Sequence, residues 1–179
     1  MRDLTGDYVA AMPGRLVLVL MGVSGSGKTT VGALLAGELH RMYAEADDFH
    51  PAANVAKMAA GHPLTDDDRW PWLHAIGRWI DERIARDESA VVTCSALKRK
   101  YRDVLRRPEV QIVYLRGSHE LIAQRLAARH GHFFKASMLD SQFADLEEPT
   151  PDEHVITVAV GASPSDIVHQ IVAETRAEG

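Results

Sequence analysis

The sequence predicts an α/β protein in which helices cover a parallel β-sheet. Short β-branched or leucine-rich runs alternate with stretches of helical pattern along the chain, and this order of elements is typical of a parallel sheet. The length of 179 residues suits one domain that can bury a substantial core. We find no internal repeat or low-complexity segment that would suggest another architecture.

Five short runs are the predicted strands. Residues 16–21, with the sequence Leu-Val-Leu-Val-Leu-Met, form the most apolar run, which is far shorter than the ~20 residues of a membrane-spanning helix. The second run is the weakest of the five. The predicted strands are residues 16–21, 42–46, 90–94, 110–115 and 154–160.

Stretches of helical pattern lie between and after these runs, and several have recognisable starts. Thr65 and Ser118 suit N-cap positions, because a hydroxyl there can accept a hydrogen bond from a free backbone N–H of the first turn. Asp66 would then lie in a first turn, where the helix dipole favours negative charge. The predicted helices are residues 28–40, 52–60, 66–86, 98–107, 119–130, 138–147 and 164–177.

The third predicted helix carries an apolar stripe at helical spacing. Such a stripe is typical of a face that packs on a sheet, and we interpret it in this way rather than as a cofactor site. Its members are Trp72, Leu73, Ile76, Trp79, Ile80 and Ile84.

Composition and charge argue against several classes of protein. The chain has 20 Lys and Arg against 25 Asp and Glu, a formal net charge of −5, which argues against coating nucleic acid or an anionic membrane. The single cysteine, Cys94, cannot form an internal disulfide, so we expect a reducing compartment, the cytoplasm. Residues 1–14 look like a short leader without the apolar segment of a secretory signal, and residues 15–179 form the predicted domain.

The strongest functional signal lies between the first strand and the first helix. Residues 22–30 contain the full phosphate-loop pattern G-x-x-x-x-G-K-[ST], at residues 22–29, in the context that it requires. Glycines let the backbone curl so that its N–H groups face phosphate oxygens, and the helix N-terminus adds partial positive charge. Lys28 would reach the β- and γ-phosphates and the Thr29 hydroxyl would bind Mg²⁺. The predicted nucleotide-binding residues here are Gly22, Val23, Ser24, Gly25, Ser26, Gly27, Lys28, Thr29 and Thr30.

This motif indicates a nucleoside triphosphate and Mg²⁺, and it is shared by small-molecule kinases, GTP switches and ATP-driven motors. A GTP switch should carry Asn-Lys-x-Asp downstream, and this chain has none; its Asp-x-x-Gly occurs only at residues 3–6, before the loop. A motor usually has an apolar strand that ends in Asp, whereas the strand at 90–94 continues into Ser95. The sequence therefore favours a kinase.

Acidic side chains follow the second predicted strand. Ligands of an open parallel sheet lie outside the carboxyl ends of its strands, so Glu45 and Asp47 should lie beside the phosphate loop. A carboxylate there can hold a metal-bound water or accept a proton from an alcohol. The alternative is a solvated acidic loop, which the nearby phosphate loop disfavours. Residues 48–89 are too long for a simple crossover, and in a small kinase they would cover the acceptor.

Two groups of basic residues follow the third and fourth strands. The first includes Lys98 and Arg102 and is either an exposed basic helix or a site for an anionic acceptor, since arginine pairs with carboxylates through two hydrogen bonds. The second lies in residues 125–136 and includes Arg125, Arg129 and His132. This segment is a candidate lid that would bring cations to a transferring phosphoryl group.

With these motifs the sequence resembles the bacterial gluconate kinases (gluconokinases) of the phosphate-loop type, which are related in fold to the shikimate kinases. The likeness extends from Val19 to about Pro149. Its most specific parts are the Asp-Asp-Asp-Arg and Gly-His-Phe-Phe segments. The matching residues are 21–28, 47–51, 54, 57–58, 61, 63–69, 71–73, 94–98, 101–102, 131–135 and 146–149.

The resemblance implies a five-stranded parallel sheet between two helical layers, a homodimer, and ATP-dependent phosphorylation of D-gluconate at the 6-hydroxyl to 6-phospho-D-gluconate and ADP. Arg125 and Arg129 would bind ATP in addition to the loop. The implied catalytic residues are Lys28, Asp47 and Arg129. The implied metal contacts are Thr29 and Glu45. The implied acceptor-binding residues are Asp47, His50, Arg69, Lys98, Arg102 and His132.

In this interpretation Asp47 orients the 6-hydroxyl and accepts its proton, while Arg69 holds the carboxylate of the sugar acid, with Lys98 or Arg102 as alternatives. Two other functions stay open: a kinase for another small anionic alcohol such as shikimate, and a nucleotide-binding regulator without catalysis. The presence of both Glu45 and Asp47 argues against the regulator.

Overall fold

The structure, a computed structural model, describes residues 17–131 and 135–177. In this part of the chain five parallel strands form one sheet in the order β2-β3-β1-β4-β5, which confirms the predicted fold class. The strands are β1 (Val17–Met21), β2 (Met42–Glu45), β3 (Ala90–Thr93), β4 (Val110–Arg116) and β5 (Ile156–Ala159).

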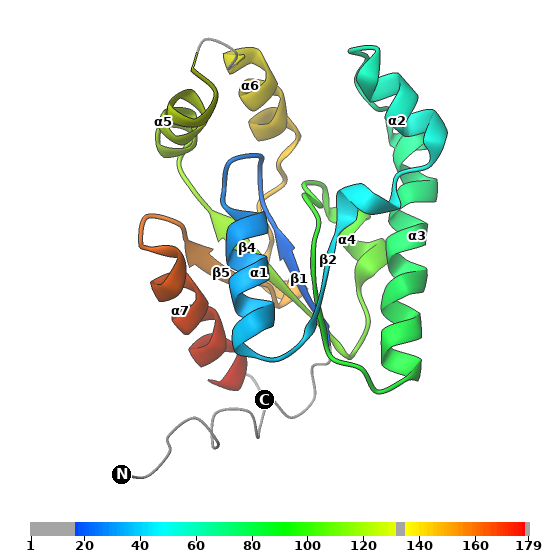
Figure 1. Ribbon diagram of the computed structural model, residues 1–179, viewed down its shortest axis with the longest axis vertical. Coiled ribbons are helices and arrows are strands. Elements are labelled where there is room, and N and C mark those ends of the chain that lie inside the picture. The colour runs from blue at the N-terminus through cyan, green and yellow to red at the C-terminus, as the bar shows by residue number, and fades with distance from the viewer. Residues whose placement is uncertain (1–16, 132–134, 178–179) are drawn as a thin grey trace.

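Helices cover both faces of the sheet (Figure 1). One face carries α1 (Lys28–Glu38) and α7 (Pro164–Ala177), which pack against each other, and the other carries α3 (Asp66–Ala85) and α4 (Arg99–Leu105). The helices α5 (His119–His130) and α6 (Ala136–Asp145) rise beyond the carboxyl ends of the strands, with α2 (Ala52–Ala59) across from them (Figure 1). Two short 3₁₀-helices, η1 (Ala46–Phe49) and η3 (Pro151–Glu153), complete the elements of the described residues that position the site.

The central strand β1 divides the core into two layers because alternate side chains of a strand point to opposite faces. Leu18 and Leu20 belong to the cluster on the side of α1 and α7, whereas Val17, Val19 and Met21 belong to the cluster on the side of α3. All five side chains are fully buried. This run is continuously apolar because both of its faces are covered.

The predicted apolar stripe of α3 is confirmed as a packing face. Trp72, Leu73, Ile76 and Ile80 are buried against the sheet in the second cluster, and Trp79 and Ile84 pack against it while partly exposed. The N-cap prediction for Thr65 is also confirmed, since its hydroxyl accepts a hydrogen bond from the Asp68 N–H and the Asp68 carboxylate accepts from the Thr65 N–H. The capping box therefore fixes where α3 begins.

Other sequence predictions meet this fold in different ways. The helix predicted at residues 138–147 lies two residues earlier, as α6. Residues 48–89 form the second half of η1 together with α2 and α3, so much of this predicted insertion is a layer of the core. The predicted leader at 1–14 lies outside the described residues. Within the described part of the chain, no helix combines the length and the apolar character of a membrane span.

Candidate active site

The phosphate loop connects the end of β1 to the start of α1, at the edge of the sheet where the carboxyl ends of the strands meet. Gly25 and Gly27 have φ angles of 82° and 94°, a backbone conformation that favours glycine. A side chain at Gly25 would also collide with Leu126 of α5, at 2.8 Å from its Cβ position. The glycine therefore serves both the curl of the loop and the close approach of α5.

Lys28 lies folded back over this loop. Its Nζ donates hydrogen bonds to the carbonyl oxygens of Gly22 and Val23, both at 2.9 Å. Burial lowers the pKa of Lys28 to about 8, against the opposing effect of neighbouring groups that include Cys94 and Asp47. An incoming phosphate would add negative charge beside this half-buried ammonium and favour its protonated form.

Glu45 ends β2 beside the phosphate loop and is held by two hydroxyl groups. Tyr43 donates a hydrogen bond to Oε1, and Thr93 donates to Oε2 at 2.6 Å. Burial alone would raise the pKa of this carboxyl, but the hydrogen bonds from Thr93 and Tyr43, together with further contributions that include the charge of Lys28, outweigh it and keep the pKa below its usual value. Glu45 is therefore an anchored carboxylate at neutral pH.

A cleft of about 810 Å³ opens over the phosphate loop. Its volume lies in the range of small-molecule and cofactor sites. Met58 of α2 and Met138 of α6 line it from opposite sides of the sheet edge. The predicted site residues in its lining are residues 24–30, Glu45, Asp47, Arg125 and Arg129.

The residues of the cleft fit a nucleoside triphosphate and its metal ion. Ser26 lines the cleft, and its buried hydroxyl has no hydrogen-bond partner among the described residues. Thr29 and Glu45 offer hydroxyl and carboxylate oxygens, the hard ligands that Mg²⁺ prefers. The loop that would bind the phosphates, the Lys28 ammonium group and the oxygen ligands for a metal ion therefore line the same cleft.

A second, much smaller cavity of about 30 Å³ adjoins the cleft, because Ser95 lines both. Arg69 and Tyr101 line this cavity, and Arg69 Nη1 donates to the Tyr101 hydroxyl at 3.0 Å. The Tyr101 hydroxyl in turn donates to Asp66. Among the basic residues predicted to bind the acceptor, Arg69 therefore lies at the margin of the cleft.

His50 and Lys98 lie near this region but line neither cavity. The His50 ring stacks on Trp72 with 4.4 Å between ring centroids, and burial lowers the pKa of His50. Lys98 Nζ lies 3.4 Å from an Asp66 oxygen and 3.9 Å from an Asp145 oxygen. Both side chains already have partners within the protein.

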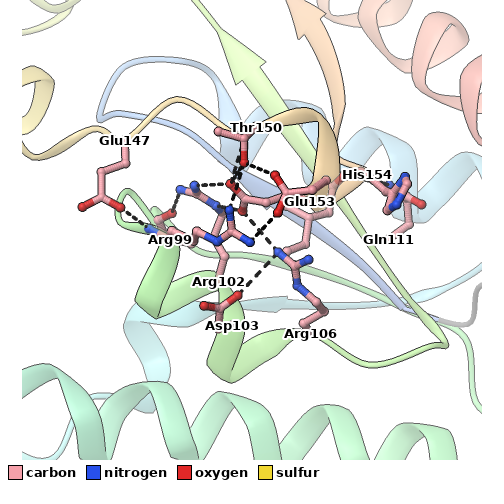
Figure 2. A network of polar contacts seen from close by, with 12 residues as sticks. Arg99, Arg102, Asp103, Arg106, Gln111, Glu147, Thr150, Glu153 and His154 are labelled. Carbon is pink, nitrogen blue, oxygen red and sulfur yellow. Dashed lines mark hydrogen bonds and ion pairs between the residues drawn. The ribbon is translucent and has the colours of Figure 1, made fainter.

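The structure contradicts the prediction that Arg102 binds the acceptor. Arg102 is fully buried, and its Nε and Nη2 donate to the two carboxylate oxygens of Glu153 at 2.7 and 2.9 Å (Figure 2). Its Nη1 donates to the carbonyl oxygens of Ala96 and Leu97 at 3.2 and 3.0 Å. All three guanidinium nitrogens are used inside the fold, so Arg102 supports the loop after β3 instead of meeting a ligand.

The two arginines of the predicted lid line the cleft from α5. Arg125 also donates to the carbonyl oxygen of Val160, next to the end of β5, which ties this side chain to the sheet. Arg129 lies one helical turn further on. His132 lies outside the described residues.

Several residues of the cleft were not predicted as site residues from the sequence, and two of them make hydrogen bonds there. Gln142 of α6 lines the cleft, and its Oε1 accepts a hydrogen bond from the backbone N–H of Ser24 at 2.6 Å. A lone glutamine in a helical pattern carries no signal that could have identified it. Thr93, which holds Glu45, was also missed, because its partner lies 48 residues away in the sequence.

The parallel sheet and the phosphate loop at its carboxyl edge define a phosphate-loop kinase fold. Residues 17–149 match the family described as AAA domain. The chain is 19% identical to the shikimate kinase from Acinetobacter baumannii, with a TM-score of 0.60 over 92% of this chain and 94% of that one. At this identity the likeness concerns the fold alone.

Named relatives are much more similar. The chain is 44% identical to the probable gluconokinase of Schizosaccharomyces pombe, over 92% of this chain and 93% of the relative. It is 46% identical to the thermoresistant gluconokinase of Escherichia coli, over 79% of this chain and 82% of the relative. A gluconokinase structure from Sinorhizobium meliloti is 44% identical over 93% of both chains, with a TM-score of 0.80. The chain belongs to the gluconokinase family, as the sequence resemblance predicted.

Proposed function

We propose that this protein transfers the γ-phosphoryl group of ATP to the 6-hydroxyl of D-gluconate, giving 6-phospho-D-gluconate and ADP. The observation that carries the proposal is the single cleft in which the phosphate loop and Asp47 both lie, in a chain of the gluconokinase family. The loop would bind the phosphates of the donor, and the Asp47 carboxylate would bind the hydroxyl group of the acceptor.

On the donor side, Lys28 and the N–H groups of the loop bind the phosphates and neutralise their charge. Arg125 and Arg129 bring further positive charge from α5, and both line the cleft. Mg²⁺, when bound, neutralises charge on the phosphate oxygens, and Thr29 would hold it, with Glu45 holding a metal-bound water. The hydrogen bonds that keep Glu45 ionised support this role.

On the acceptor side, Asp47 orients the 6-hydroxyl and accepts its proton as the phosphoryl group transfers. Its side chain is 90% exposed and lines the cleft, so an alcohol can reach it. Arg69 holds the carboxylate at the other end of gluconate. Ser95, which borders both the cleft and the Arg69 cavity, supports a continuous path for one extended substrate. Lys98 and His50 are outer residues of this acceptor site.

The remaining proposals concern the whole protein. We propose a cytoplasmic homodimer with no nucleic-acid or membrane partner. The family resemblance supports the dimer, the single buried Cys94 supports a reducing compartment, and the net charge of −5 supports the absence of bulk binding to polyanions.

The substrate proposal is tested by a coupled ADP-release assay with ATP and Mg²⁺ over a panel of sugar acids and shikimate. We expect gluconate to give a kcat/KM far above that of every other acceptor. Release of ADP with shikimate and not with gluconate would contradict the proposal. Equal ADP release with and without any acceptor would mean hydrolysis and would contradict it as well.

A further inference from the structure

We propose that Gln142 is the residue with which α6 binds the γ-phosphoryl group, so that the protein distinguishes ATP from ADP. The proposal rests on ATP being the phosphoryl donor. Gln142 would act as a neutral hydrogen-bond donor at the end of the phosphate chain, in addition to the cations of the loop and of α5.

The contact between Gln142 and Ser24 fixes the orientation of the glutamine amide. The two residues are 118 positions apart in the sequence, and the Ser24 backbone N–H donates to Gln142 Oε1 at 2.6 Å. A backbone N–H can only donate, so the oxygen of the amide must face the loop. The Nε2 group, with its two N–H bonds, is then left for another acceptor.

The position of Ser24 places this amide at the γ end of the phosphate site. Ser24 follows Val23, whose carbonyl oxygen accepts from Lys28 Nζ at 2.9 Å. In a phosphate loop this lysine reaches the β- and γ-phosphates. The start of α1, with Thr29, lies at the other end of the curl. A group that contacts Ser24 is therefore next to the last phosphate rather than the first.

Several contacts hold α6 in place before any ligand binds. Leu139 is buried in the core, and Asp140 Oδ1 lies 2.6 Å from Nε2 of His119 in α5. Just beyond the helix, the Glu147 N–H donates to the Leu97 carbonyl oxygen at 2.9 Å. Gln142 sits between these anchors, so its donor is positioned in advance and little ordering cost opposes its use.

Binding measurements on two variants test the proposal without the acceptor. Isothermal titration calorimetry with Mg²⁺ compares a non-hydrolysable ATP analogue with ADP. Gln142→Glu keeps the shape and the oxygen that Ser24 bonds, and it replaces the donor with an anionic oxygen. We expect this variant to bind the analogue about 10- to 100-fold more weakly, the effect of losing a hydrogen bond to a charged group, while its Kd for ADP changes by less than about twofold.

Gln142→Ala is the second variant, and it should weaken binding of the analogue by about tenfold with the same small effect on ADP. The matched control is Gln170→Glu on the exposed face of α7, where the glutamine bonds only Glu174 among the described residues. The control should leave both Kd values unchanged. Thermal melting of each variant shows whether it is folded. If Gln142→Glu does not fold, the affinities of Gln142→Ala decide whether Gln142 binds the γ-phosphoryl group.

Three results would overturn the inference. An equal loss of affinity for the analogue and ADP would make Gln142 a structural tie between α6 and the loop. Tighter binding of the analogue would mean that Gln142 competes with a phosphate oxygen for Ser24. Unchanged affinities would show no role in nucleotide binding. A wild-type protein that binds neither nucleotide would instead contradict the proposed function itself.

Discussion

Arg102 and Glu153 form an ion pair that is completely enclosed by the fold, with two hydrogen bonds of 2.7 and 2.9 Å between them (Figure 2). Arg106 adds a third hydrogen bond to Glu153 at 3.2 Å. Because Arg102 also holds the carbonyl oxygens of Ala96 and Leu97, this pair joins η3 to the loop that carries Ser95 into the cleft. The pair is therefore part of the framework of the site.

Removing the charge of Glu153 should destabilise the protein strongly. Glu153→Gln leaves the buried Arg102 guanidinium without its counter-ion, and we expect a loss of about 3–5 kcal/mol in the free energy of unfolding, measured with urea. The matched control is Asp152→Asn, which removes the exposed partner of Arg99 and should leave the free energy of unfolding almost unchanged. Similar losses in both variants would contradict this account of the buried pair.

The same pair predicts how stability depends on pH. The Arg102 hydrogen bonds lower the pKa of Glu153 to about 2, from an ordinary value of 4.5. Its contribution is therefore present above pH ~4.5 and is lost as the pH falls towards 2. The difference in stability between wild type and Glu153→Gln should narrow over that window. If the stability difference between the two proteins stayed constant from pH 6 to pH 3, it would contradict the lowered pKa of Glu153 in the folded protein.

Nucleotide binding should weaken in alkaline solution because of Lys28. Burial lowers the pKa of Lys28 to about 8, and only the protonated ammonium attracts phosphate. Binding then takes up a proton, so the Kd for a non-hydrolysable ATP analogue should rise by up to about tenfold per pH unit above pH 8. Lys28→Ala should abolish ADP release while the fold persists, and its residual binding should lose this pH dependence. A wild-type Kd that is constant from pH 7.5 to 9.5 would contradict the prediction.

Replacing the Asp47 carboxylate with an amide tests its proposed role as proton acceptor. Asp47→Asn cannot accept the proton of the hydroxyl, so kcat should fall by about 10²-fold or more while the affinity for ATP changes little. The neighbouring Asp48 is also exposed but does not line the cleft, so Asp48→Asn is the matched control and should keep its activity. A near-normal kcat in Asp47→Asn would move the role to Glu45 or to water.

If Arg69 holds the carboxylate of gluconate, Arg69→Leu should raise the KM for gluconate by about 10- to 100-fold, the effect of losing charged hydrogen bonds. Arg78→Leu, on the exposed side of the same helix, is the control and should leave KM unchanged. Steady-state kinetics with varied gluconate give both values. With an unchanged KM in Arg69→Leu, Lys98 would become the favoured anchor.

Arg129 should matter most during phosphoryl transfer. Its charge would act on the developing charge of the transferring group, so Arg129→Ala should lower kcat more than it raises the KM for gluconate. Single-turnover rates with saturating ATP separate this effect from nucleotide binding. A variant that loses affinity for gluconate and keeps its kcat would place Arg129 on the acceptor side.

The elements of the fold could be predicted from the sequence because their signals are local. Strands β1 and β4 read as apolar runs that are buried on both faces, and the capping residues Thr65 and Ser118 marked the starts of α3 and α5 within one residue. The phosphate loop was equally visible, since a short contiguous motif specifies its backbone.

The rest of the site depends on contacts between distant parts of the chain. Arg102 looked like a ligand-binding cation because its partner Glu153 lies 51 residues further on, and no local pattern links the two residues. Gln142 gave no signal because its contact to Ser24 arises only when α6 packs over the loop. Burial and pairing decide whether a basic residue is free to bind a ligand, and the sequence pattern of this region does not contain that information.

The phosphorus-31 NMR spectrum of the reaction product tests the central claim most directly. With ATP, Mg²⁺ and D-gluconate, the protein should produce ADP and an equal amount of one phosphomonoester. Carbon 6 is the only CH₂ group of gluconate, so transfer to its hydroxyl predicts a proton-coupled phosphorus triplet. A doublet, which reports a phosphate on a CH carbon, or inorganic phosphate as the sole product, would contradict the account.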